Sequence, residues 1–194
     1  MNFNIVNSDV NILLIEPYFT GSHKQWAEGF AKHSRHDVRL LTMKGQFWKW
    51  RMHGGAVTLA REFNALNWRP DLILTTDMLD VTTFMALTQS KSHGIPIAIY
   101  FHENQISYPW SPNDRDIQKN RDSHYGFINY ASTLAADTIF FNSDFHMESY
   151  LGELPKFLRH FPDHRELDSV DIIREKSRIL HLGMDLQKFD IHKT

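Results

Sequence analysis

Cysteine is absent from this sequence of 194 residues. Its absence excludes a disulfide framework and a thiolate metal site, and it fits a reducing compartment. Long apolar runs are absent too, and the N-terminal segment MNFNIVNSDV has no basic region followed by an apolar core. We therefore expect a cytoplasmic protein that has no membrane partner.

An excess of charge of either sign is also lacking. The 21 Lys and Arg residues nearly balance the 23 Asp and Glu residues, which gives a formal net charge of -2. A chain with this balance has no global attraction to nucleic acid, so a polyanionic partner would have to meet a local basic patch. The hydrophobic fraction of 42% is sufficient for one sizeable core. We expect residues 1–10 to form an N-terminal extension and residues 11–194 to form a single domain.

Short apolar runs alternate along the chain with longer amphipathic stretches. Each run is too short for a helix and ends in polar or turn residues, which is typical of a strand. The predicted strands are Asn11–Ile15, Val38–Thr42, Leu72–Thr75, Ile97–Phe101, Thr138–Asn142 and Arg178–Leu182. Apolar residues at helical spacing predict helices at His23–His33, Ala56–Trp68, Val81–Ser92, Gln118–Ala136 and Ser143–His160. The alternation predicts an α/β fold with a doubly wound, mainly parallel sheet, which is Rossmann-like.

Ligands of such a sheet bind at the carboxyl ends of the strands, near a reversal of strand order. The first of these ends is followed by Gly21 and Ser22 just before a predicted helix, where free N–H groups can face an anion such as a diphosphate. The segment is neither a GxGxxG nor a Walker loop. A turn glycine followed by Ser22 as helix N-cap is an equally good interpretation.

Aromatic and cationic residues interleave in the segment MKGQFWKWRMHGG, after the second predicted strand. Trp48 and Trp50 offer stacking surfaces for bases or sugar rings, and Arg51 is suited to phosphate. The segment therefore predicts a local polyanion patch on a neutral protein. The alternative is that the tryptophans only pin a long loop to the core.

Four polar residues end the fourth predicted strand, in the segment YFHENQISYP. His102 can exchange a proton near neutral pH or hydrogen-bond a sugar hydroxyl, and Glu103 could orient it or act itself. Asn104 and Gln105 add neutral donors and acceptors that suit a polyol or a base edge. A core histidine bonded to the backbone is the usual alternative for a lone His, but four polar residues at a ligand edge favour function.

Polar residues also follow the fifth predicted strand and the long helix after it. Asn142 is expected to project into the same cleft as His102, whereas a role as helix N-cap explains Ser143. His164 and Arg165 lie in the segment FPDHR, and their spacing alone indicates a solvated surface.

Twelve histidines raise the question of a metal site, but no H-E-x-x-H or comparable ligand spacing occurs. Nucleophilic catalysis is disfavoured because the chain has no cysteine and no G-x-S-x-G elbow. We expect neither a metal nor a cofactor.

Five segments together give the chain a family resemblance. LLIEPYFTGSHKQWAEGF, KGQFWKWRMHG, YFHENQISYP, FFNSDFHMESYL and FPDHR, in this order and spacing, resemble the N-terminal half of the tRNA-queuosine mannosyltransferases, over nearly all of residues 11–190. The resemblance implies a retaining glycosyltransferase of the GT-B class, related to family 4, that transfers mannose from GDP-mannose to the cyclopentenediol of queuosine in tRNA. It also implies that this chain is the acceptor-side half. The C-terminal donor-binding half is absent from it, so we expect the chain alone to be inactive.

The resemblance further implies roles for individual residues. His102 matches the strand-end position that contacts the transferred sugar, and with Glu103 it is the candidate for catalysis, although no protein base is assigned. Donor contacts are expected from Gly21, Ser22, His23, Asn142 and Ser143. Acceptor contacts are expected from Asn104, Gln105, Trp48, Trp50, Arg51, His164 and Arg165.

Two other functions stay open at this point. One is a glycosyltransferase half that acts on another small molecule or a glycan, against which the WKWR segment argues weakly. The other is a non-catalytic RNA- or nucleotide-binding module.

Overall fold

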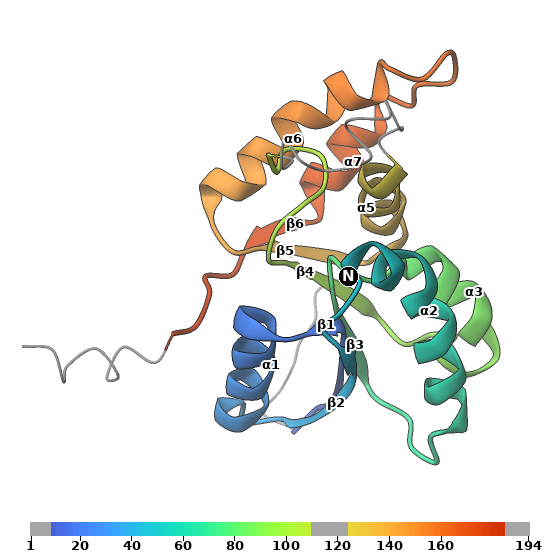
Figure 1. Cartoon of the computed structure of the whole chain (residues 1–194), viewed down its shortest axis with the longest axis vertical. Coiled ribbons are helices and arrows are strands. Elements are labelled where there is room, and N and C mark those ends of the chain that lie inside the picture. Colours follow the sequence, from blue (N-terminus) through green and yellow to red (C-terminus); the bar gives the residue numbers. More distant parts are fainter. Residues whose placement is uncertain (1–8, 110–123, 185–194) are drawn as a thin grey trace, which may run out of the picture.

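The computed structural model describes residues 9–109 and 124–184. These residues form one six-stranded sheet in which all neighbouring strands are parallel, in the order β2-β1-β3-β4-β5-β6 (Figure 1). The strands are β1 (Asn11–Phe19), β2 (Asp37–Lys44), β3 (Leu72–Thr76), β4 (Ile97–Phe101), β5 (Thr138–Phe141) and β6 (Ser177–Ile179). The sheet confirms the predicted Rossmann-like α/β fold and is consistent with the N-terminal half of a GT-B fold.

Helices form the connections between the strands. They are α1 (Gly21–His33), α2 (Trp48–Ala65), α3 (Val81–Ser92), α5 (His124–Ala135), α6 (Asp144–Leu158) and α7 (Ser169–Glu175). The short helix α7 was not predicted, and residues 118–123 of one predicted helix lie outside the described residues. Within the described ranges, no helix combines the length and the apolar character needed to cross a membrane.

Alternation along β1 separates two apolar clusters, one on each face of the sheet. Leu14 lies in the cluster that holds Trp26 of α1 and Tyr100 of β4. Its neighbour Ile15 lies in the larger cluster, to which α2, α3, α5, α6 and α7 contribute. Figure 1 shows α1 on the opposite side of the sheet from α2 and α3. A polar side chain of β1 that points to the same face of the sheet as Leu14 therefore lies beneath α1.

The strand order reverses between β1 and β3. The chain passes from β1 to β2 on one side and then returns to β3 on the other side of β1. A crevice at the carboxyl ends of the strands beside such a reversal is the usual ligand site of a doubly wound sheet. The ends of β1, β3 and the adjacent β4 are therefore the place to look for a site.

Helix α2 begins at Trp48, well before the predicted start at Ala56. The WKWR segment is thus the first turn of a helix, and the prediction of a long loop there was wrong. Phe47 precedes the helix in a left-handed conformation, with φ of 53°, and its side chain makes no capping bond. A helix start without a capping side chain has no signature in the sequence, which is the reason that this start was missed.

Candidate active site

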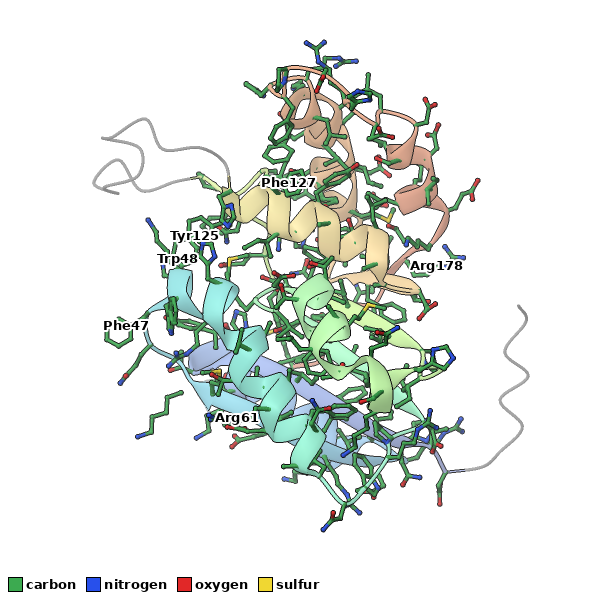
Figure 2. All side chains as sticks on the ribbon, turned by 90° about the vertical axis from the view of Figure 1, so that its right-hand side faces the viewer. Phe47, Trp48, Arg61, Tyr125, Phe127 and Arg178 are labelled. Atoms are coloured by element: carbon green, nitrogen blue, oxygen red, sulfur yellow. The ribbon has the colours of Figure 1, made fainter. Side chains whose placement is uncertain are left out.

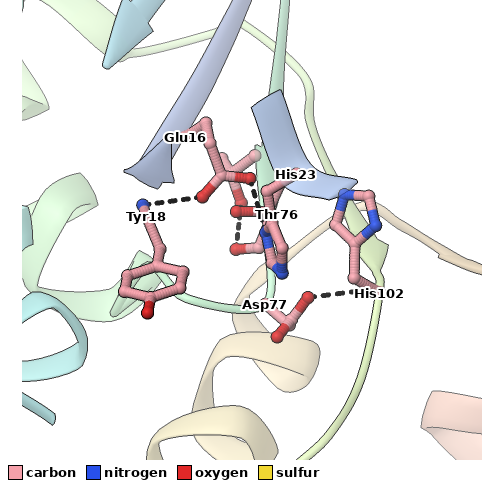
Figure 3. Close-up of polar contacts among 7 residues, drawn as sticks. Glu16, Tyr18, His23, Thr76, Asp77 and His102 are labelled. Atoms are coloured by element: carbon pink, nitrogen blue, oxygen red, sulfur yellow. Dashed lines mark hydrogen bonds and ion pairs between the residues drawn. The ribbon is translucent and has the colours of Figure 1, made fainter. Parts of the chain in front are cut away.

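Four polar side chains meet beneath the first turn of α1 (Figure 3). Glu16 lies two residues after Leu14 on β1, so its side chain points to the same face of the sheet and faces α1. Asp77 follows β3, and His102 follows β4. His23, in the first turn of α1, completes the group. The structure thereby brings the predicted residues His23 and His102 together at the reversal of strand order.

Glu16 holds His23 as a cation. Nδ1 of His23 lies 3.0 Å from Oε2 of Glu16, and the backbone N–H of Tyr18 donates to Oε1 of the same carboxylate at 2.7 Å. Burial alone would lower the pKa of His23, but the hydrogen bond to Glu16 and the nearby negative charges outweigh it and raise this pKa to about 9. His23 therefore carries a positive charge at neutral pH.

His102 is neutral although it lies beside this cation. The rings of His102 and His23 are 4.3 Å apart between centroids, and Trp26 and Tyr100 pack around His102 at 4.7 and 5.0 Å. Burial, and then the positive charge of His23 and the nearby imidazole of His146, lower the pKa of His102 to about 3. A neutral imidazole can accept and donate a hydrogen bond, so His102 suits a sugar hydroxyl.

The backbone of His102 is fixed from two sides. Its N–H donates to Oδ1 of Asp77 at 2.8 Å, and its carbonyl accepts from Nδ2 of Asn142 at 2.8 Å. Oδ1 of Asn142 in turn accepts from Oγ of Ser143 at 3.1 Å. Ser143 is the N-cap of α6, as predicted, because its side chain accepts from the N–H of His146. Asn142 thus positions His102, and its contact with a donor stays a prediction.

Buried polar atoms without a partner gather at the same edge of the sheet. Among the described residues, the buried side-chain atoms that have no hydrogen-bond partner are Oγ1 of Thr76, Oδ2 of Asp77, the hydroxyl of Tyr100 and Nε2 of His102. All four come from the ends of β3 and β4. Because buried polar groups in proteins are nearly always paired, this group of atoms marks a place that suits a polar ligand.

Asp77 is the second buried carboxyl group of the site. Burial raises its pKa to about 7, against the lowering effect of the positive charge of His23. Asp77 therefore titrates near neutral pH, and its unpaired Oδ2 can act as a donor in one protonation state and as an acceptor in the other.

The first turn of α1 offers backbone N–H groups to an anion. Thr20 precedes this helix and makes no side-chain capping bond, so the interpretation of Ser22 as the N-cap was wrong. Gly21 has φ of 51°, a left-handed conformation that favours glycine, and the space beside it is open. This turn and the cationic His23 suit a diphosphate, and the donor contacts of Gly21, Ser22 and His23 stay predictions.

The segment HENQ leads into a tight turn. The amide oxygen of Asn104 accepts from the N–H groups of Ile106 and Ser107 at 3.0 and 2.8 Å. The buried side chain of Asn104 is thus committed to the turn. Nε2 of Gln105 lies 3.5 Å from the carboxylate of Glu103. The catalytic role of Glu103 and the acceptor contacts of Asn104 and Gln105 stay predictions.

The tryptophans at the start of α2 differ in their surroundings. Trp48 is half-buried and packs with Tyr18 and Tyr125 on a small apolar cluster, as the pinning interpretation expects. Trp50 is 62% exposed. Tyr18 packs on the same cluster, and its ring lies 5.9 Å from that of His23, so this cluster extends from Trp48 to the site.

His164 and Arg165 lie away from this site. They border a hollow of about 270 Å³, lined also by Phe127, Tyr130, Leu158, Phe161, Pro162, Asp163 and Glu166. Helix α6 has 15 residues and is therefore about 22 Å long; Asn142 precedes its start, and the loop with His164 follows its far end (Figure 1). The structure does not bring these two residues to His102, and their acceptor contacts stay predictions.

Sequence reasoning missed Glu16, Asp77 and Asn129. Asn129 of α5 donates to the carbonyl of Asp77 at 2.9 Å and accepts from the N–H of Gln105 at 2.8 Å, so it joins two strand-end loops. A carboxylate at the end of an apolar strand is a visible signal, and it could have identified Glu16 and Asp77. Asn129 lies inside a helix, where its sequence context carries no such signal.

Glu16, His23 and His102 also form a set of metal-ligand types. Among the described residues, each of the three offers one ligand atom, and these atoms lie within 4.8 Å of one another. The carboxylate of Glu16 already accepts a hydrogen bond from His23, and a metal would have to displace that proton. The expectation of a metal-free site stays a prediction.

Comparison with known proteins gives the site a family context. Residues 11–184 match the family model described as tRNA-queuosine alpha-mannosyltransferase N-terminal. The chain is also similar to the tRNA-queuosine alpha-mannosyltransferase of Drosophila melanogaster, with 32% identity over 187 residues. The match covers 94% of this chain and 47% of that relative, so the chain spans about half the length of the relative.

Proposed function

Because the chain belongs to the tRNA-queuosine alpha-mannosyltransferase N-terminal family, we propose that it is the acceptor-side half of an enzyme that transfers mannose from GDP-mannose to queuosine in tRNA. The transfer retains the anomeric configuration. A second half, of the kind that the longer relative has room for, binds most of the donor and completes the site. The chain alone is therefore inactive in this proposal.

The pairing of a cationic His23 with a neutral His102 is the observation that supports this function most directly. A nucleotide sugar presents a diphosphate and a polyol side by side. The diphosphate is stabilised by a cation and free N–H groups, whereas the hydroxyl groups need neutral donors and acceptors. The first turn of α1 with His23 suits the former, and Nε2 of His102 with Oδ2 of Asp77 suits the latter.

In the proposed reaction a hydroxyl of the queuosine diol forms a bond to the anomeric carbon of mannose. The bond from that carbon to the diphosphate breaks on the same face, and GDP leaves with the electron pair. His23 and the N–H groups of α1 stabilise the negative charge that develops on the leaving diphosphate. The proton of the acceptor hydroxyl passes to the departing diphosphate, so no base from the protein is required. His102 and the adjacent Glu103 hold the sugar in place.

The test uses the complete natural protein with tRNA that contains or lacks queuosine and with a panel of nucleotide sugars. Mass spectrometry of the tRNA nucleosides is expected to show one added hexose on queuosine, with GDP-mannose only. No modification with any donor would contradict the tRNA assignment, and modification with another donor would revise only the sugar. Mannosyl transfer by the 194-residue chain alone would contradict the need for a second half.

A pair of histidine variants assigns the site. His102→Ala is expected to lower turnover by roughly two orders of magnitude or more, because it removes a contact with the transferred sugar. His33→Ala is the matched control, since His33 is an exposed histidine in the last turn of α1. Circular dichroism and unfolding curves establish that both variants fold. Near-normal turnover of a folded His102→Ala variant would remove this residue from the site.

A further inference from the structure

Two aromatic side chains at the start of α2 extend into solvent. Phe47 is 75% exposed and Trp50 is 62% exposed. Phe47 also has a left-handed backbone, with φ of 53°, which is strained for a bulky residue. Its carbonyl accepts from the N–H groups of Trp50 and Arg51 at 2.8 and 3.0 Å, but glycine or asparagine would start the helix with less strain. The helix start therefore does not account for the exposed phenyl ring.

The indole of Trp50 lies against its own helix. A Cβ atom at Gly54, one turn further along α2, would come within 2.6 Å of Cζ2 of Trp50. Glycine at this position therefore allows the ring to lie close to the helix backbone while much of the ring stays in solvent. An exposed aromatic ring that is supported from behind is a surface on which an unpaired base can stack.

The surroundings of these rings are basic although the protein as a whole is not. Residues 38–61 contain five Lys or Arg residues and no Asp or Glu, in a chain of formal charge -2. Nε of Arg51 donates to the carbonyl of Lys44 at 3.0 Å, which holds the guanidinium group beside the loop that carries Phe47. Phosphate groups would therefore meet cations next to the stacking surfaces.

Further rings continue this surface from α2 onto α5. His53 stacks on His124 with 4.3 Å between centroids and 12° between planes, and Trp48 lies 5.2 Å from Tyr125. In Figure 2, Trp48 and Tyr125 lie between Phe47 at the start of α2 and Phe127 of α5. The surface called here the α2–α5 strip consists of five exposed residues and the half-buried Arg51; the exposed residues are Phe47, Trp50, His53, His124 and Phe127. Phe127 also lines the hollow that His164 and Arg165 border.

We propose, on the basis of the function proposed above, that the α2–α5 strip binds an unpaired stretch of the acceptor RNA. Bases stack on Phe47 and Trp50, and the phosphates between them meet Arg51 and Lys44. A regular RNA duplex offers no base faces to such rings, because its bases are stacked within the helix. The five Lys or Arg residues of residues 38–61, with no Asp or Glu among them, favour a polyanion over a neutral protein surface.

Contact between two loops places this strip beside the active site. A Cβ atom at Gly45 would lie 2.3 Å from Cβ of Thr20, so the loop before α2 approaches the residue before α1 very closely. Tyr18 packs in the same cluster as Trp48 and lies 5.9 Å from His23 between ring centroids. A nucleotide stacked on the strip is therefore held next to the first turn of α1, which carries His23.

The test measures RNA binding without any nucleotide sugar. Fluorescence anisotropy with the complete natural protein compares a hairpin RNA, which has an unpaired loop, with a blunt duplex of the same stem. The hairpin is expected to bind more tightly. Phe47→Ala and Trp50→Ala are each expected to weaken hairpin binding about tenfold, and Trp50→Phe to retain most of it. Equal affinity for hairpin and duplex, or unchanged binding by the double alanine variant, would overturn the proposal.

Matched variants outside the strip serve as controls. Phe145→Ala removes a phenyl ring that is 83% exposed on α6, and Lys32→Ala removes an exposed cation on α1. Neither is expected to change hairpin affinity. Arg51→Ala is expected to reduce the slope of log affinity against log salt by about 0.7. If the alanine variants changed only the self-association of the protein, as seen by sedimentation, the strip would be a protein interface and the proposal would fail.

The outcomes separate this proposal from the proposed function. Mannosyl transfer that does not depend on Phe47 or Trp50, with unchanged hairpin binding, would overturn the role of the strip and leave the activity intact. Loop-selective binding that depends on these residues, without transfer from any donor, would overturn the activity and leave the RNA surface intact.

Discussion

The imidazole rings of His23 and His102 lie 4.3 Å apart and differ in charge at neutral pH. The difference arises from Glu16, which bonds to Nδ1 of His23, whereas aromatic rings surround His102. The carboxylate of Glu16 thus keeps His23 a cation, while burial keeps the adjacent His102 neutral.

Replacement of Glu16 by Gln is expected to reverse the protonation of His23. The negative charge of Glu16 raises the pKa of His23; glutamine keeps an acceptor for Nδ1 but not the charge, so burial then lowers this pKa well below 9. Side-chain nitrogen NMR of the histidines over pH 4 to 10 measures the change. In the natural protein His23 is expected to lose its proton near pH 9, and His102 to stay neutral over the whole range. Loss of the His23 proton below pH 7 in the natural protein would contradict the ion pair.

The free energy of unfolding is expected to fall as the pH rises from 6.5 to about 9. The pKa of His23 is about 9 in the folded state and 6.5 in the unfolded chain, so its stabilisation is complete below pH 6.5 and is lost as the pH rises through 9. The loss amounts to about 3 kcal/mol at most. Denaturant unfolding at several pH values measures this loss. The free energy of unfolding of the His23→Gln variant is subtracted from that of the natural protein at each pH, which removes the contribution of other titrating groups. A difference that does not vary with pH would contradict this linkage.

Asp77→Asn is expected to remove a pH dependence near neutrality. Loss of the Asp77 proton, at a pKa of about 7, adds a negative charge next to the proposed diphosphate position, so kcat/KM for the donor should fall above pH 7. Asparagine keeps the acceptor for the N–H of His102 but cannot ionise, and its profile should be flat there. Asp77→Ala is the contrasting variant, because it leaves that buried N–H unpaired and should destabilise the fold by about 1 to 3 kcal/mol. If kcat/KM of the Asp77→Asn variant still fell above pH 7, the titrating group would be a residue other than Asp77.

Gly54→Ala is expected to weaken hairpin RNA binding without destabilising the fold. The added Cβ displaces the end of the Trp50 side chain, which can move, while alanine favours the helix by up to about 1 kcal/mol. Gly152→Ala is the matched control, since Gly152 lies in α6 with open space around it. Both variants should have equal or greater thermal stability, and only Gly54→Ala should bind the hairpin less tightly. Equal RNA binding by the two would show that the position of the indole is unimportant.

Gly45→Ala is expected to lower the free energy of unfolding by about 1 to 3 kcal/mol, because its Cβ overlaps the side chain of Thr20. Adding Thr20→Gly removes the overlapping atoms and should restore a large part of the loss. Chemical denaturation of the single and double variants measures the coupling. Additive effects of the two substitutions would contradict the close approach of the two loops.

The sequence was sufficient to predict the sheet and part of the site. Alternation of apolar and amphipathic segments is a local property, and it identified six strands close to their observed positions. Polar residues at a strand end identified His102, whereas His23 was expected only from the family resemblance. The bond between Glu16 and His23 was not visible, because it depends on how α1 lies over β1. The start of α2 was missed because a left-handed Phe47, and no capping side chain, begins that helix.

The link between Glu16 on β1 and His23 on α1 also fixes the two ends of the loop that contains Gly21. A loop that is tied at both ends has few conformations left to lose when a ligand arrives. Its N–H groups are therefore already ordered in the folded protein. Binding of an anion then costs less conformational entropy. Separation of Glu16 from His23 would thus weaken anion binding even at a pH at which the charge of His23 is unchanged.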